Sequence, residues 1–157
     1  MKIELRQRTA EHVKIYFQKA ADPEIRALLP QSAQSLEEAL EDYARSVSPG
    51  SASYGRTIYA DDTYVGDIWC YCIHEDTNPD AMISYCVFEK SYWNQGIATR
   101  AVQLFLQEVT EKFALSSIGA FTYSYNLPSL KVLAKTGFRV VEEFLEDGVP
   151  SCYLQKG

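Results

Sequence analysis

The sequence lacks the patterns of several protein classes, and these absences narrow what it can be. No apolar run approaches the roughly 18 residues of a membrane span. The opening residues 1–6 lack the apolar stretch of a signal peptide, so we expect a cytoplasmic protein that makes no membrane contact. The chain has 157 residues, 46% of them hydrophobic and 23% charged, with no repeat, low-complexity tract or linker. These values predict a single globular domain spanning residues 1–157.

Metal-site and disulfide patterns are also missing. Only two histidines occur, His12 and His74, and no pair of cysteines has the CxxC spacing, so we expect no metal site. Cys70 and Cys72 are two residues apart in a predicted strand, which places their Cα atoms about 6.6–6.8 Å apart and their side chains on one face. That separation is too long for easy bridging. We therefore expect all the cysteines to be buried free thiols: Cys70, Cys72, Cys86 and Cys152.

Basic residues are too few for a general nucleic-acid-binding face. The 15 Lys and Arg are outnumbered by 21 Asp and Glu, giving a net charge of −6 and a pI near 4.9. We expect no nucleic-acid partner. An acidic protein instead attracts cationic partners such as amines, and any anionic ligand needs local positive contacts.

Hydrophobic periodicity predicts alternating strands and helices. A strand over 1–8 precedes a helix capped by Thr9 and broken at Asp22-Pro23, and Ser35 caps a second helix over 35–47. The expected buried face of this second helix is Leu36, Ala39, Leu40, Tyr43 and Val47. The remaining predicted elements are strands at 52–60, 63–74 and 80–89, a helix from Gly96 to Phe113, a strand at 117–123, a helix at 127–136, and strands at 138–141 and 151–154. This order indicates one mixed α/β sheet with helices on both faces.

The most informative segment is residues 84–99, where a strand ends and a long helix begins at Gln95-Gly96-Ile97-Ala98-Thr99. A helix start presents unpaired N–H groups and a partial positive charge, which suit a phosphate. Small residues also begin helices for packing reasons, so this pattern alone does not decide. The sequence has neither a GxGxxG fingerprint nor the P-loop lysine motif, which disfavours an unrelated nucleotide-binding domain.

A second motif supports the first. Asn126 and Ser129 follow a strand and open a helix that ends at Gly137-Phe138. With both motifs present, the sequence resembles the GNAT superfamily of N-acetyltransferases, and within it the branch of ribosomal-protein N-terminal alanine acetyltransferases (the RimJ/RimL-like branch). The acetyl-CoA loop of that superfamily is matched by Trp93-Asn-Gln-Gly96-Ile-Ala98, although Trp93 replaces the usual Gln or Arg.

The resemblance implies a single mixed, mostly antiparallel sheet of about seven strands flanked by about four helices, with acetyl-CoA as co-substrate. The backbone of one strand would pair with the pantetheine arm, amides from Gln95 to Thr99 would cradle the pyrophosphate, and Asn126 would bond near the thiol. The implied cofactor-binding residues are Cys86, Val87, Phe88, Trp93, Asn94, Gln95, Gly96, Ile97, Ala98, Thr99, Arg100, Asn126, Ser129 and Lys131, with Lys135 beside them. Lys131 and Lys135 also fit a solvated helix face.

The resemblance does not supply the acid and the base directly. Leu133 occupies the position where many relatives carry a proton-donating Tyr, so Ser129 is the first candidate acid, with Tyr123 and Tyr125 behind it. Ser84 stands where some relatives place a glutamate base. Glu89 is the candidate base, with Glu75, Asp76 and His74 as the other titratable groups near that strand. Backbone N–H groups near Val87 and Phe88 would stabilise the oxyanion.

The sequence therefore predicts an N-acetyltransferase that moves the acetyl group of acetyl-CoA to a primary amine, either a protein N-terminus or a small amine. Its partners would be acetyl-CoA and the amine acceptor, and the protein would be a monomer or a homodimer. The alternative is a non-catalytic acetyl-CoA sensor or interaction domain. The acceptor stays open, since the helices over 9–47 would form one wall of its groove.

Overall fold

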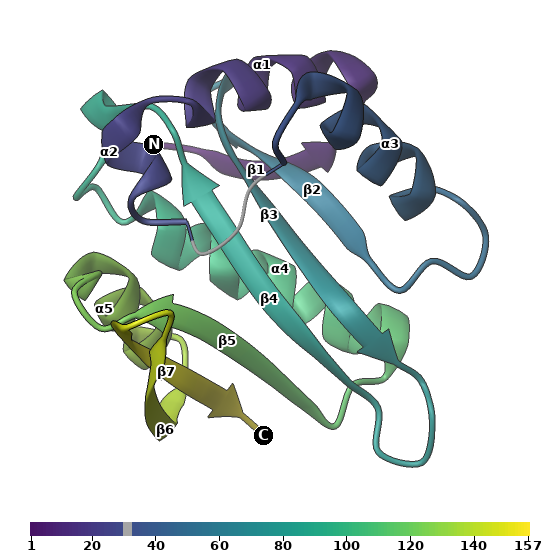
Figure 1. The fold of residues 1–157 in the computed structure, drawn as a ribbon. Helices are drawn as coiled ribbons and strands as arrows, with labels where there is room; N and C mark the ends of the chain where they lie inside the picture. The colour runs from purple at the N-terminus through teal and green to yellow at the C-terminus, as the bar shows by residue number, and fades with distance from the viewer. Residues whose placement is uncertain (30–32) are drawn as a thin grey trace.

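The computed structural model describes residues 1–29 and 33–157, and its strands form a seven-stranded sheet in the order β1-β2-β3-β4-β5-β7-β6 (Figure 1). Only β4 and β5 pair in parallel, and every other neighbouring pair is antiparallel. The strands are β1 (Ile3–Gln7), β2 (Tyr54–Ala60), β3 (Thr63–His74), β4 (Asp80–Val87), β5 (Ser117–Tyr123), β6 (Arg139–Glu146) and β7 (Val149–Lys156). The expected mixed, mostly antiparallel sheet is confirmed.

Local capping chemistry sets where the helices begin. Thr9 caps α1 (Ala10–Ala20), and its own amide donates to Nδ1 of the His12 ring at 3.0 Å. Ser35 caps α3 (Leu36–Ser46) by accepting from the Glu38 amide at 3.1 Å. Both predicted caps are confirmed. The other long helices are α4 (Ile97–Phe113) and α5 (Leu127–Lys135).

The break predicted at Asp22-Pro23 also starts a new helix. Asp22 accepts from the Glu24 amide at 2.9 Å, and Pro23 is the first residue of the one-turn helix α2 (Pro23–Arg26). Proline suits that position because its missing N–H would have no partner in the helix. A further turn of 3-10 helix, η1 (Lys90–Tyr92), lies between β4 and α4.

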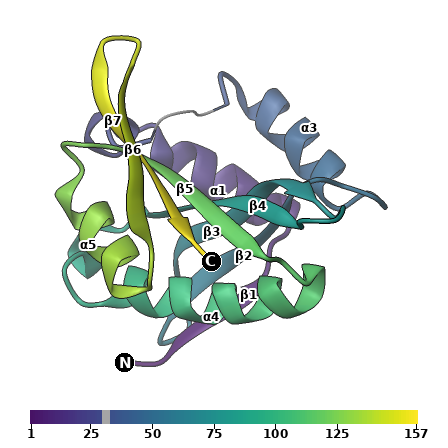
Figure 2. The same ribbon diagram turned by 90° about the horizontal axis from the view of Figure 1, so that it is seen from below.

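Helices cover both faces of the sheet, with α1 and α3 on one side and α4 on the other (Figure 2). Apolar residues recur at intervals of four along α4, and this face is buried at Ile97, Ala101, Phe105 and Val109. Together with the sheet it forms the main core. No helix in the described ranges is both long and apolar enough to cross a membrane.

The expected buried face of α3 is wrong. None of its residues is buried, and Leu36 and Val47 are exposed. The helix packs against α1 rather than directly on the sheet, and a pocket lined by Ala39 and Tyr43 lies beneath it. The apolar face of α3 therefore lines a cavity and does not pack into the core.

One cysteine also departs from expectation. Cys70, Cys86 and Cys152 are buried, but Cys72 is exposed. The pairing of β3 with β4 shifts register between Tyr71 and His74, and Cys72 has φ +51°. This bulge reverses the alternation, so that Ile73 turns inward and Cys72 turns outward.

The C-terminal hairpin is longer than the sequence predicted. Its turn is Asp147-Gly148, both at positive φ, as the Asp-Gly pair indicates. Most of β6 is exposed, including Val140 and Leu145. Because neither face of this strand is buried, its sequence lacks the alternation of apolar and polar residues by which a strand is predicted.

Close packing between β3 and β4 depends on Gly66. A Cβ atom at this position would lie 2.2 Å from the Cys86 carbonyl oxygen and 2.9 Å from the Val87 Cα. Backbone atoms cannot move aside as a flexible side chain can, so only glycine lets these two strands approach.

We expect Gly66→Ala to lower the free energy of unfolding by about 1–3 kcal/mol, the usual cost of overpacking. Gly55→Ala on β2 is the matched control, because its Cβ would meet the mobile end of Arg8 at 3.2 Å. Urea unfolding of both variants measures the difference. Equal stability of the two variants would contradict the close-approach argument.

Candidate functional site

The sheet opens between its two parallel strands. β4 and β5 pair from Asp80↔Ser117 to Ile83↔Ala120 and no further. Beyond that point they diverge toward their C-terminal ends (Figure 1). The second half of β4, residues 84–87, therefore keeps β3 on one side and faces a gap on the other.

Polar side chains converge at the start of this gap. Asn126 caps α5, accepting from the Ser129 amide at 3.4 Å, so both predicted residues sit at the same helix start. The Ser129 hydroxyl lies 3.0 Å from the hydroxyl of Tyr85 on β4. These residues and Ser84 line a small cavity of about 30 Å³. The structure thus brings Asn126 and Ser129 together and adds Tyr85, which lies within the strand predicted at 80–89.

The two alternative acids are placed less favourably. Tyr123 and Tyr125 stack on each other with ring centroids 5.3 Å apart. Tyr125 is exposed, and its hydroxyl donates to the Ala27 carbonyl. Neither tyrosine lines the small cavity.

Strand alternation decides which backbone amides of β4 face the gap. The Phe88 amide donates to the Val65 carbonyl on β3 at 2.9 Å. Alternate residues point the other way, so the amides of Tyr85 and Val87 face the gap. The Phe88 amide is thus already bonded to β3, and Cys86 shares its orientation, so the cofactor-binding role of these two residues stays a prediction. The Trp93 indole donates to the Val87 carbonyl at 2.7 Å and fastens the following loop to the strand.

The loop ends at Gly96, which has φ +79° and open space where a Cβ would be. No side chain caps α4, so the amides of its first turn, at Ile97, Ala98 and Thr99, are open to a ligand. Asn94, also at positive φ, and Gln95 are exposed. A 17-residue helix directs its positive end at this opening.

Positive charge lies around the same opening. Arg100 is exposed in the first turn of α4, and Lys131 and Lys135 are exposed on α5. These two helices contact each other. Their side chains remain candidates for an anionic ligand, and the structure does not test that role.

Glu89 lies in a different setting from the one predicted for a base. It follows β4 at the start of η1, and its carboxylate pairs with Lys19 of α1 at 3.0 Å. Its neighbour Lys90 pairs with Asp22 and Glu24. These contacts tie the loop to the corner between α1 and α2. They give Glu89 a structural partner, and its catalytic role stays a prediction.

The other candidate bases lie at the far end of β3 and β4. His74 is exposed and contacts Asp80 at 2.9 Å. Glu75 and Asp76 are exposed in the loop that joins these strands. The β4–β5 gap opens at the opposite end of β4.

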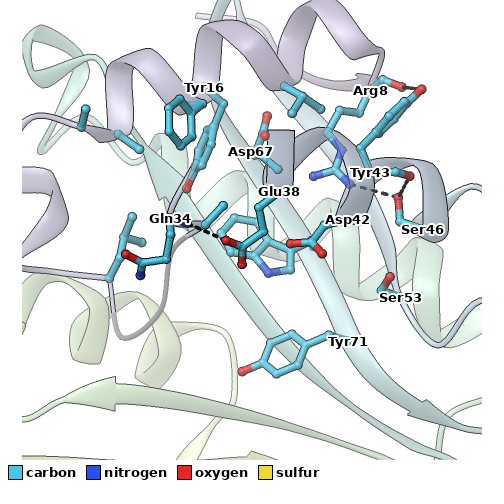
Figure 3. Close-up of a pocket in the computed structure, with 18 of the residues that line it drawn as sticks. Arg8, Tyr16, Gln34, Glu38, Asp42, Tyr43, Ser46, Ser53, Asp67 and Tyr71 are labelled. Atoms are coloured by element: carbon cyan, nitrogen blue, oxygen red, sulfur yellow. Dashed lines mark hydrogen bonds between the residues drawn. The ribbon is translucent and has the colours of Figure 1, made fainter. Parts of the chain in front are cut away.

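A large pocket of about 510 Å³ lies on the sheet face that carries α1 and α3 (Figure 3). Its walls are aromatic, with Tyr16 from α1 and Trp69 and Tyr71 from β3. Glu38 and Asp42 of α3 point into it. Pockets of this size hold small-molecule ligands.

Sequence analysis missed the carboxylate at the base of this pocket. Asp67 of β3 is 2% exposed and accepts from the Tyr64 hydroxyl at 2.6 Å. Burial raises the pKa of Asp67 to about 7, although the Tyr64 bond and the positive charge of Arg8 both oppose that rise. A carboxylate that titrates near neutral pH is suited to proton transfer. An aspartate within an otherwise apolar and aromatic strand was the sequence signal.

Comparisons with known proteins agree with this geometry. Residues 2–139 match the acetyltransferase (GNAT) domain family. Among solved structures, the fold is similar to a RimL ribosomal L7/L12 alpha-N-protein acetyltransferase in complex with coenzyme A, at 18% identity and a TM-score of 0.83. The match covers 99% of this chain and 94% of that one.

Two other solved structures share the fold. One is spermidine N-acetyltransferase from Vibrio cholerae with CoA and spermine, at 13% identity and a TM-score of 0.86, covering 98% of this chain and 94% of that one. The other is the aminoglycoside acetyltransferase AAC(6')-Ib with paromomycin and acetyl-CoA, at 16% identity and a TM-score of 0.83. This match covers 99% of this chain and 93% of that one. No curated protein sequence is significantly similar to the chain.

The buried Asp67 predicts an unusual pH dependence of stability. Its folded-state pKa, about 7, lies above the ordinary value of 3.8, so its contribution to stability is complete below pH 3.8 and is lost as pH rises through 7. We expect Asp67→Asn, which cannot ionise but can still accept from Tyr64, to be more stable than wild type at pH 8, by up to about 4 kcal/mol. The advantage should vanish near pH 4. Chemical denaturation at both pH values measures it, and a variant less stable at pH 8 would contradict the ionised, buried carboxylate.

Proposed function

The chain belongs to the GNAT acetyltransferase family, and from that premise we propose that its β4–β5 gap binds acetyl-CoA and that its large pocket admits the primary amine it acetylates. The observation that carries the proposal is the end of strand pairing at Ile83 and Ala120. The gap begins there, and the two faces of the sheet differ around it. The uncapped start of α4 and the residues of α5 lie toward one face of the sheet, and the large pocket lies on the other face.

The residues present fit acetyl-CoA. The amides of Tyr85 and Val87 offer strand-like pairing to the pantetheine arm. The first amides of α4 suit the pyrophosphate, with Gly96 leaving the approach open. Arg100 and Lys131 supply local positive charge to an otherwise acidic protein. When bound, acetyl-CoA supplies the acetyl thioester.

Ser129 is placed to hand a proton to the departing thiolate. Its hydroxyl is held by the Tyr85 hydroxyl, and both line the small cavity at the start of the gap. Burial raises the pKa of Tyr85 to about 12, with the bond to Ser129 opposing the rise, so the pair is protonated at neutral pH. The Asn126 side chain fixes the helix start that carries Ser129.

Two acceptor classes fit the pocket. The resemblance to the ribosomal-protein branch favours a protein N-terminus, whereas an aromatic pocket with Glu38 and Asp42 on its wall also suits a small cationic amine. The structural relatives are named for a ribosomal protein, spermidine and aminoglycosides, so the shared fold does not choose between these classes. An assay of amine-terminated peptides against small amines decides it.

We expect acetyl-CoA to stabilise the protein against heat, and Gly96→Trp to remove that effect. Ligand at about 100 times its Kd adds about 2.7 kcal/mol. The bulky side chain would fill the approach to the first amides of α4. Differential scanning fluorimetry with and without acetyl-CoA measures both.

The matched control is Gly148→Trp, which carries the same strain of a side chain at φ +80° but lies in the β6–β7 turn. It should keep the full acetyl-CoA shift. If wild type shows no shift, the proposed cofactor site fails. A shift without acetylation of any amine would favour the non-catalytic sensor.

We expect Ser129→Ala to lower kcat by about 10²-fold while leaving the Kd for acetyl-CoA unchanged, the usual scale for losing a general acid. Ser116→Ala, an exposed serine before β5, is the control. Steady-state kinetics and calorimetric titration separate the two effects. Wild-type turnover by Ser129→Ala would remove Ser129 from the mechanism and transfer the role to Tyr85.

A further inference from the structure

Asp67 is a buried acid that no step described so far uses. It sits on β3 directly across from Cys86 of β4, and it lines the large pocket. We propose that Asp67 is the general base of the reaction, taking the proton from the ammonium group of the acceptor; this inference rests on the proposed N-acetyltransferase function.

Position is the first argument. Neighbouring strands lie about 4.8 Å apart, so Asp67 is one strand away from the backbone that faces the gap. Its side chain and that of Cys86 point to the α1 face, whereas Tyr85 and Ser129 lie on the opposite face. An amine entering the pocket would therefore meet Asp67 before it meets the gap.

The groups around Asp67 favour a proton acceptor over a permanent ion pair. Those that face it are Tyr64 from its own strand, Tyr16 from α1, Cys86 from β4 and Arg8 from the segment before α1. Arg8 is the one permanent charge among them, and it also bonds Ser46 and lies over the Tyr43 ring. Burial raises the pKa of both Tyr16 and Cys86, so these two stay neutral at neutral pH.

A second polar atom marks the same spot. The Tyr16 hydroxyl is buried beside the Cys86 thiol, a weak hydrogen-bonding group, and no atom within the described ranges meets full hydrogen-bond geometry with it. Buried hydroxyls are almost always bonded, so an unpartnered one beside a buried carboxylate indicates a group still to come. An ammonium has three donors, enough to reach both Asp67 and Tyr16.

The step balances as follows. An N–H bond of the ammonium breaks and an O–H bond forms on the Asp67 carboxylate, leaving the amine neutral. The lone pair of the amine then forms the N–C bond to the acetyl carbon as the C–S bond breaks. The amide nitrogen loses its surplus proton to water in the pocket. The sulfur takes a proton from the Ser129 hydroxyl. Ser129 is reprotonated and Asp67 deprotonated by solvent. Each turnover converts one ammonium to an amide, forms one thiol and releases one proton.

The alternative carboxylates are worse placed. Glu89 is held by Lys19 at the loop, and Asp42 pairs with Arg45 on α3. Glu38 is exposed on α3 and accepts from the Gln34 amide. Among the carboxylates of residues 1–29 and 33–157, only Asp67 combines near-complete burial with a place in the pocket wall next to β4.

The test compares wild type with Asp67→Asn over pH 5–9, using a primary alkylamine and a fluorinated alkylamine that is already neutral at the assay pH. We expect Asp67→Asn to lower kcat/KM for the ordinary amine by about 10²-fold or more and to abolish the limb of the pH profile on which activity rises near pH 7. The loss should shrink at least tenfold for the fluorinated amine, because that acceptor needs no base. Glu143→Gln, an exposed carboxylate of β6, is the control.

Each result decides the proposal. Equal losses for the two amines would show a positioning or structural role and overturn the assignment. Wild-type activity and an unchanged profile in Asp67→Asn would overturn it too, while leaving the N-acetyltransferase function intact. If wild type binds acetyl-CoA but acetylates no primary amine, the proposed function fails and the base assignment fails with it.

Discussion

The parting of β4 from β5 is the constraint on which the rest of the structure depends. A sheet gains stability by pairing every backbone N–H and C=O, and an unpaired stretch in its interior is costly unless something else pairs with it. This sheet stops its one parallel pairing at Ile83 and Ala120 and continues both strands. β5 is instead paired along its length with β7, and β4 with β3. The gap is thus held open by the ladders on both sides, and it leaves the amides of Tyr85 and Val87 facing the space where a strand-shaped ligand would fit.

Alternation along β4 then separates two kinds of chemistry. Successive side chains of a strand point to opposite faces, so Tyr85 faces α5 and meets Ser129, while Cys86 faces α1 and lies across from Asp67. The proposed proton donor and the proposed proton acceptor therefore lie on opposite sides of one sheet. The same division explains why a nominally acidic protein can hold an anion: the uncapped start of α4 lies at the gap, and the carboxylates Glu38 and Asp42 line the pocket on the other face.

The sequence predicted what local chemistry determines and missed what tertiary packing determines. The caps at Thr9 and Ser35, the apolar face of α4 and the Asp-Gly turn follow from a few neighbouring residues, and all are present. The outward turn of Cys72 depends on a bulge that has no local signature, and the exposed face of α3 depends on the cavity below it. Asn126 and Ser129 were found because they belong to a motif. Asp67 was not, because the role proposed for it depends on its burial and on Tyr64 and Tyr16, which only the folded chain brings together.

Ion pairs join the loop of the gap to the helices of the pocket, so the two halves of the site are not independent. Lys19 and Lys90, which lie near the predicted pyrophosphate loop, are already paired with Glu89, Asp22 and Glu24. They therefore set the position of the α1–α2 corner and do not contribute free charge to the anion. Asp67 and Tyr16 line the pocket beneath α1 and α3, and α1 carries Lys19. A change in the loop would thus move the wall of the pocket proposed for the amine. Burial of Asp67 raises its pKa and so destabilises the folded protein at neutral pH, and this residue lies in the pocket wall where the proposed proton transfer would use it.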